Sequence, residues 1–177
     1  GRKTADVVPV QISRRQIEEL QRQFTVAAIL PVTPLQQGML FHAGQSGADG
    51  LYAVQLDLTL SGPLDVQRLR DATHTVLRRH PHLGARFTQR FGEPMQVIAA
   101  DPDFAWNAVE LRTEDEIAAL RAAERAGVGD LEHRSPFRVA LIRTAEQQHR
   151  LVLTNHHIVM DGWSMPIVLS EIFAAYY

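Results

Sequence analysis

The side chains best suited to chemistry are concentrated near the C-terminal end, in residues 155–164, which read NHHIVMDGWS. Histidine is the usual proton-transfer group in enzymes because its ordinary pKa lies nearest neutrality. In this run His157 could accept a proton from an attacking amine or hydroxyl, or hold that group in place. The amide of Gly162 could approach a developing oxyanion, and Asp161 could orient or charge-balance the site. These groups predict acyl transfer without a covalent intermediate.

Two other interpretations of the histidine pair stay open at this point. Both imidazoles could be structural, each bonded to the backbone, with Asp161 capping a helix. A metal site could use His156, His157 and Asp161, but neighbouring residues of an extended chain point to opposite faces and would not converge. We therefore expect no metal, one structural histidine, His156, and one catalytic histidine, His157, which lies nearer the loop.

The elements around this run predict how it is held. Residues 137–143 and 150–154 alternate between apolar and polar side chains, as strands do. Ser164, with Pro166 two residues later, is typical of a helix start. A loop between a strand and a helix lies at the end of a sheet, where the free N–H groups of the helix point toward it.

The remaining sequence predicts a mixed α/β (α+β) sandwich. Ser13, Thr33 and Thr113 each begin a capping box, and Asp65 is a fourth helix cap. Residues 51–60 alternate as a half-buried strand, with Gln55 and Asp57 on its polar face. The expected helices cover residues 13–24, 33–44, 65–80 and 113–127, the further expected strands cover 85–90, 95–99 and 104–111, and 29–32 are an apolar connector containing a proline.

Composition excludes several classes of protein. The chain has 177 residues, 45% of them hydrophobic, which is enough for one globular domain with a core. It has no cysteine, so disulfides, thiolate metal sites and a cysteine nucleophile are excluded. A net charge of −2 gives no support for nucleic acid as a partner, because such a partner would call for a basic face. No apolar run is long enough to cross a membrane and the N-terminal residues do not read as a signal peptide, so we expect a soluble cytoplasmic protein.

The histidine run resembles the signature of the condensation domains of non-ribosomal peptide synthetases, His-His-x-x-x-Asp-Gly. His156, His157, Asp161 and Gly162 match it, and Trp163-Ser164 is its common continuation. Residues 33–42, TPLQQGMLFH, resemble the first characteristic block of that family, and residues 79–87 resemble the second. Three blocks in order identify residues 30–177 as the N-terminal lobe of such a domain. Residues 1–29 are then an inter-domain linker with a short helix, and the C-terminal lobe is absent.

The resemblance implies a chloramphenicol acetyltransferase-like fold of two lobes with a tunnel between them. Upstream and downstream peptidyl carrier proteins would present phosphopantetheine-bound substrates from opposite ends, and no cofactor would be bound directly. The acceptor amine would attack the donor thioester and form a peptide bond. The second histidine of the family's motif is its active-site residue, which carries over to His157. The aspartate of the motif is a structural residue paired with an arginine, and this role carries over to Asp161. Trp163 is likewise assigned a structural role.

The second block departs from the family at one position. An arginine usually follows the leucine, where this chain has Gly84, and an arginine stands instead at Arg86. Arg86 is therefore a candidate for the structural arginine, and a solvated strand residue is the alternative. Candidates for tunnel lining are Gln37, Met39, His42 and Ser164, although ordinary helix packing accounts for the first block better than direct catalysis does.

The first block also resembles the subtype that takes a donor with a D-configured terminal residue and joins it to an L-configured acceptor. An upstream epimerisation domain is accordingly a further candidate partner. Two competing functions remain. Asn155-His156 with Asp161 fits a pattern of glycerolipid acyltransferases, and a degenerate lobe could be a non-catalytic module that recruits carrier proteins. Because the second lobe with its half of the tunnel is missing, the isolated lobe is expected not to catalyse condensation.

Overall fold

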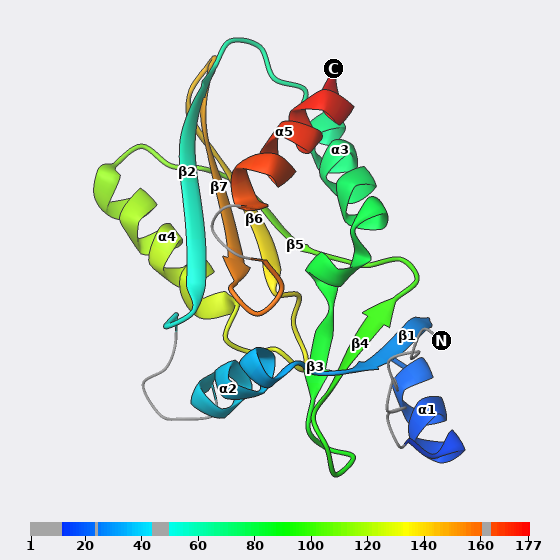
Figure 1. Cartoon of the computed structure of the whole chain (residues 1–177). Helices are drawn as coiled ribbons and strands as arrows, with labels where there is room; N and C mark the ends of the chain where they lie inside the picture. Colours follow the sequence, from blue (N-terminus) through cyan, green and yellow to red (C-terminus); the bar gives the residue numbers. More distant parts are fainter. Residues whose placement is uncertain (1–11, 24, 44–49, 161–163) are drawn as a thin grey trace, which may run out of the picture.

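The computed structural model describes residues 12–23, 25–43, 50–160 and 164–177 (Figure 1). Within these ranges the chain forms two β-sheets, several α-helices and one short 3₁₀-helix. The helices are α1 (Arg14–Gln21), α2 (Pro34–Ala43), α3 (Val66–Arg79), η1 (Pro81–Gly84), α4 (Glu114–Gly127) and α5 (Ser164–Tyr176). The strands are β1 (Val26–Pro31), β2 (Ala53–Ser61), β3 (Arg86–Thr88), β4 (Met95–Ala99), β5 (Ala105–Glu110), β6 (Phe137–Ala145) and β7 (Gln148–His156).

The larger sheet has the order β2-β7-β6-β5 and is covered on both faces (Figure 1). Its only parallel pair is β5 with β6, joined by the crossover helix α4, as a parallel connection requires. Along β7, Leu151 and Leu153 pack in the cluster shared with α3 and α5, whereas Val152 packs with Ile117 of α4. These three layers confirm the predicted α/β sandwich.

The smaller sheet, in the order β1-β4-β3, contains a strand that the sequence did not predict. Residues 29–32 were expected to be a connector because Pro31 has no N–H to donate, but β1 runs from Val26 to Pro31 and pairs antiparallel with β4. Proline is tolerated here because Pro31 is the last residue of an edge strand. The expected linker boundary at residue 29 falls inside this strand.

Helix α2 begins as predicted and packs beside the small sheet. The Thr33 N–H donates to Gln36 Oε1 at 2.9 Å, and the Gln36 N–H donates to Thr33 Oγ1 at 3.1 Å, which completes the capping box. Met39 and Leu40 are buried in a cluster that also holds Ile158 of the histidine run. The predicted capping box at Ser13 is formed in the same way at the start of α1.

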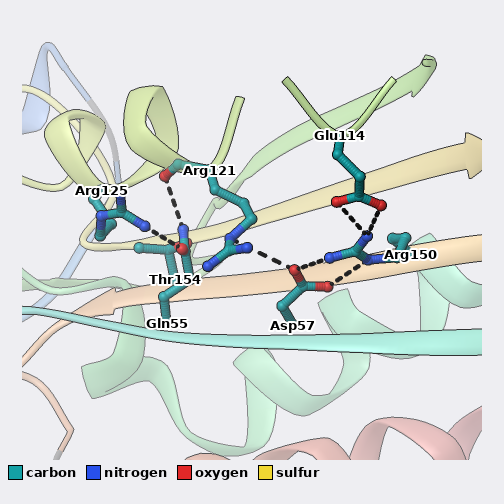
Figure 2. A network of polar contacts seen from close by, with 7 residues as sticks. All are labelled: Gln55, Asp57, Glu114, Arg121, Arg125, Arg150 and Thr154. Atoms are coloured by element: carbon teal, nitrogen blue, oxygen red, sulfur yellow. Dashed lines mark hydrogen bonds and ion pairs between the residues drawn. The ribbon is translucent and has the colours of Figure 1, made fainter. Parts of the chain in front are cut away.

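Strand β2 is half-buried as predicted, and its polar face lies against α4, which the prediction did not specify (Figure 2). Arg150 of β7 donates to both carboxylate oxygens of Asp57, at 2.6 and 3.0 Å, and also to Glu114. Gln55 Nε2 donates to the Arg121 carbonyl oxygen at 2.9 Å and accepts from Arg125 through its Oε1 at 2.7 Å. Ion pairs and amide bonds therefore hold α4 to the sheet beside its apolar contacts.

Among the helices in the described ranges, none is both long and apolar enough to cross a membrane.

Candidate active site

The histidine run lies between the end of β7 and the start of α5, as the sequence predicts. Strand β7 ends at His156, residues 157–159 form a turn, and α5 begins at Ser164. The site candidates Asp161, Gly162 and Trp163 lie outside the described residues. The structure therefore supplies the geometry of the histidine half of the motif.

Burial alternates through this segment. His156, Ile158 and Met160 are 3%, 5% and 6% exposed, whereas His157 and Val159 are half-buried. Ile158 belongs to the cluster with α2 and β3, and Met160 belongs to the cluster with α3 and α5. Two apolar anchors in different clusters thus fix the turn, Val159 between them packs partly against both clusters, and His157 just before them stays half-buried.

His156 is a neutral residue that shapes the turn from inside. Its Nδ1 accepts the N–H of Ile158 at 3.0 Å, so the ring proton lies on Nε2. The ring centroid lies 5.7 Å from that of Tyr52. Burial, followed by the charge of His157, lowers the pKa of His156 to about 4. These contacts support the structural role assigned to this histidine.

His157 is the first residue beyond the strand, and its backbone is tied to the sheet. Its N–H donates to the Tyr52 carbonyl oxygen at 2.7 Å, which extends the β2–β7 pairing by one residue. Its ring Nδ1 is buried and has no hydrogen-bond partner within the described ranges. The backbone of His157 is thus fixed, while its ring keeps the capacity for a new hydrogen bond.

His156 is committed to a backbone contact in this conformation. Over the described ranges no group of three or more histidine, aspartate or glutamate side chains is arranged to hold a metal ion. The acceptor role of His156 Nδ1 toward Ile158 uses one of its ring nitrogens, and the proton occupies the other. The structure thus describes a half-buried His157 with a buried ring Nδ1 beside a buried His156.

Two side-chain amides that sequence reasoning did not assign to the site contact the turn. Asn155, which is 0% exposed, donates through Nδ2 to the carbonyl oxygens of His156 and Met160, both at 2.9 Å. Gln36 Nε2 donates to the Ile158 carbonyl oxygen at 3.3 Å. The sequence did contain a signal for Asn155, since it is a polar residue at the end of a strand whose two faces are both apolar. A buried amide in such a place must form hydrogen bonds to the backbone.

The four tunnel-lining candidates lie in different surroundings. Gln37 and His42 are exposed on α2, and the His42 ring centroid is 6.3 Å from that of Tyr52. Met39 is buried in the cluster with Ile158. Ser164 lines a pocket of about 210 Å³. The other residues that line this pocket are His80, His82, Leu83, Val159, Met160, Ile167, Val168 and Glu171.

Arg86 lies on β3, and its ion-pair partner among the described residues is Asp103. Its Nη2 donates to Asp103 at 2.7 Å, and the side chain is only 13% exposed, so it is not a solvated strand residue. A Cβ atom at Gly84 would lie 2.8 Å from Pro102 Cβ and 3.2 Å from the Asp103 carbonyl oxygen. The glycine departure thus accompanies a close approach of residues 102–103, the same segment that binds Arg86.

Comparison with known families identifies the domain to which this fold belongs. A family model described as the condensation domain matches residues 26–177. The chain belongs to the condensation domain family. Bacitracin synthase 1 of Bacillus licheniformis is 32% identical over 168 residues, which cover 90% of this chain and 3% of that protein. Vanchrobactin synthetase VabF of Vibrio anguillarum is 33% identical over 184 residues, which cover 97% and 6%.

Solved structures agree with this condensation fold. The epimerization domain from the third module of tyrocidine synthetase B superposes with a TM-score of 0.74 at 23% identity, over 87% of this chain and 36% of that one. The starter condensation domain of the rhizomide synthetase RzmA gives a TM-score of 0.72 at 19% identity, over 85% and 37%. The chain thus spans a little over a third of each solved chain and a few per cent of the synthetases.

Proposed function

We propose that this chain is the N-terminal half of a condensation domain that forms peptide bonds in non-ribosomal peptide synthesis, with His157 as its active-site residue. One observation carries the proposal. His157 is fixed by its backbone at the end of β7, beside a neutral histidine, while its ring Nδ1 is buried and without a partner among the described residues. That is the state expected of a side chain kept for hydrogen bonding to a substrate.

The proposed reaction is aminolysis of a thioester. The α-amine of the acceptor attacks the thioester carbonyl carbon of the donor, the C–N bond forms and the C–S bond breaks. The amine proton leaves and the departing thiolate is protonated, so charge and atoms balance. His157 orients the amine or takes its proton, and we assign stabilisation of the oxyanion to the amide of Gly162.

The other motif residues are assigned supporting roles in this proposal. His156, Asp161, Trp163 and Arg86 belong to the scaffold. The tunnel-lining assignments of Gln37, Met39, His42 and Ser164 remain predictions, for which the exposure of Gln37 and His42 on α2 is the favourable observation.

Partners follow from the same proposal. The substrates would arrive on the phosphopantetheine arms of upstream and downstream peptidyl carrier proteins, with no cofactor bound directly. The C-terminal lobe would supply the opposite wall of the tunnel, so residues 1–177 alone are expected to form no amide bond. The first block supports a D-configured donor and an epimerisation domain upstream.

The test is His157→Ala in a synthetase that contains this chain, with turnover measured from loaded donor and acceptor carrier proteins. We expect a fall of about 10²- to 10⁴-fold, the usual contribution of a positioned acid–base group. His133→Ala is the matched control, because His133 is an exposed histidine paired with Asp130. Unchanged turnover in His157→Ala, with carrier proteins still bound, would replace this proposal with the recruitment module. Acyl transfer to a glycerolipid would favour the lipid acyltransferase.

A further inference from the structure

The carbonyl groups of the histidine turn are held by side chains from two directions. Asn155 Nδ2 bridges the carbonyl oxygens of His156 and Met160, which flank the three-residue turn that begins at His157. From α2, Gln36 Nε2 donates to the carbonyl oxygen of Ile158, in the middle of the turn. Both ends of the turn are therefore tied to one buried side chain, and its centre is tied to another element.

The orientation of the Asn155 amide follows from its neighbours. Two carbonyl oxygens lie 2.9 Å from the same terminal atom, and only the NH₂ group can donate to both. The reversed amide would place oxygen against two carbonyl oxygens at full burial, where unsatisfied polar groups are most costly. The two hydrogens of Nδ2 thus match the two carbonyls, a requirement that neither aspartate nor leucine meets.

The geometry points to Asn155 as the positioning residue of His157, an inference that rests on the proposed function. Asn155 is placed to act without touching substrate, by closing the backbone on both sides of the active-site histidine. Without the bridge, the His156 and Met160 carbonyls lose their shared donor, and the turn can relax away from the β2–β7 pairing. A displacement of about 1 Å in a positioned catalytic group can lower a rate about 100-fold.

The first experiment compares Asn155→Leu with Thr154→Val in the synthetase that contains this chain. Thr154 is the neighbouring residue of β7, also 0% exposed, and its hydroxyl accepts from Gln55 on the α4 side of the sheet. We expect Asn155→Leu to lower kcat about 100-fold with KM for both carrier proteins within twofold of the parent, and Thr154→Val to change kcat less than threefold. Equal losses in both variants, or a kcat within threefold of the parent in Asn155→Leu, would overturn the inference.

Hydrogen exchange gives a readout that does not depend on catalysis. The N–H groups of Ile158 and Val159 bond to His156 within the turn. In Asn155→Leu their exchange is expected to rise at least tenfold, measured by mass spectrometry of peptides covering residues 157–160, and to stay unchanged in Thr154→Val. If exchange is faster in Asn155→Leu but turnover is normal in both Asn155→Leu and His157→Ala, the proposed function of His157 is wrong and the role of Asn155 in holding the turn still stands. Unchanged exchange would overturn the role of Asn155 itself.

A second variant avoids any difficulty in folding the buried substitution. Gln36→Glu keeps an acceptor for the Thr33 N–H, so the capping box survives, but it removes the donor to the Ile158 carbonyl oxygen. We expect kcat to fall on the order of fivefold, the equivalent of one lost hydrogen bond. Gln16→Glu makes the same change in the capping box of α1 and is expected to leave kcat unchanged. Equal kcat values in the two variants would contradict fixation of the turn from both sides.

Discussion

The buried histidine of the motif should make folding stability depend on pH in a defined window. Folding favours the neutral form of His156, since burial lowers its pKa from 6.5 to about 4. As pH falls, the unfolded chain binds the proton first, so this contribution is fully present above about pH 6.5 and is lost down to about pH 4. The informative perturbation is His156→Asn, whose Oδ1 can still accept the Ile158 N–H but does not titrate.

The magnitude follows from the two pKa values. At about 1.4 kcal/mol for each pH unit between them, the free energy of unfolding falls by about 3 kcal/mol from pH 7 to pH 4, about 2 kcal/mol of it by pH 5. A domain of this size has a total stability of about 5–15 kcal/mol, so the loss is a large fraction of it. His156→Asn also loses packing against Tyr52, but that loss is the same at every pH.

The assay is urea unfolding at pH 7, 6, 5 and 4, followed by circular dichroism, for the parent chain and His156→Asn. The variant is less stable at pH 7, and its deficit is expected to shrink by about 3 kcal/mol at pH 4. Burial also lowers the pKa values of His149 and His82, so the parent curve alone does not isolate His156. Stability curves that stay parallel from pH 7 to pH 4 would refute the assignment of a buried neutral His156.

Three substitutions test the packing that positions the site, each by urea unfolding at pH 7. Asp57→Asn removes the carboxylate that accepts two hydrogen bonds from Arg150 and leaves exposed Glu114 as its remaining ion-pair partner. The Asp57 and Arg150 side chains are 15% and 19% exposed, so we expect a loss in the free energy of unfolding of about 2–3 kcal/mol, somewhat below that of a fully buried pair, and no loss would mean that the pair is solvated. Gly84→Ala brings a Cβ to 2.8 Å from Pro102 Cβ and should lower the free energy of unfolding by about 1–3 kcal/mol. An unchanged free energy of unfolding would contradict this close approach. Gly38→Ala lies inside α2, with nothing within 4 Å of its new Cβ, and should instead raise the free energy of unfolding by about 0.5–1 kcal/mol. A lower free energy of unfolding would show that α2 is packed on that side.

Local signals predicted much of this fold because they act within a few residues. The capping boxes at Ser13 and Thr33 need only a hydroxyl and a glutamine three positions later, and both form as predicted. The strand, loop and helix around the histidines were likewise predicted from alternation in the strand and from Ser164 at the helix start. Helix caps and strand alternation can be recognised from the sequence because all the residues that produce them lie within one short segment.

Features that depend on distant neighbours were not predictable in this way. Pro31 indicated a break because a proline inside a sheet loses a hydrogen bond, yet among the described strands β1 lies at the edge of its sheet and pairs with β4 alone. Gln55 and Asp57 indicated a polar face, but α4, which is more than fifty residues away in sequence, covers it and supplies Arg125 to Gln55 and Arg121 to Asp57. Polar alternation specifies two faces of a strand without specifying whether the polar one meets water or another element.

The two histidines show most directly why residue type and spacing do not suffice for the site. Both faces of β7 are covered, by α3 and α5 on one side and by α4 on the other, so alternation alone does not select which imidazole becomes buried. The selection comes from Ile158 and Met160, which fill two separate clusters and fix the backbone that follows His157, so that His156 is buried and His157 is half-buried. If these anchors were shifted by one residue, His156 and His157 would exchange surroundings. His157 would then be the buried neutral imidazole, and His156 would be the one whose ring is available for a new hydrogen bond. The motif names the reactive groups, and the apolar residues between them, together with the Asn155 amide, determine which group can react.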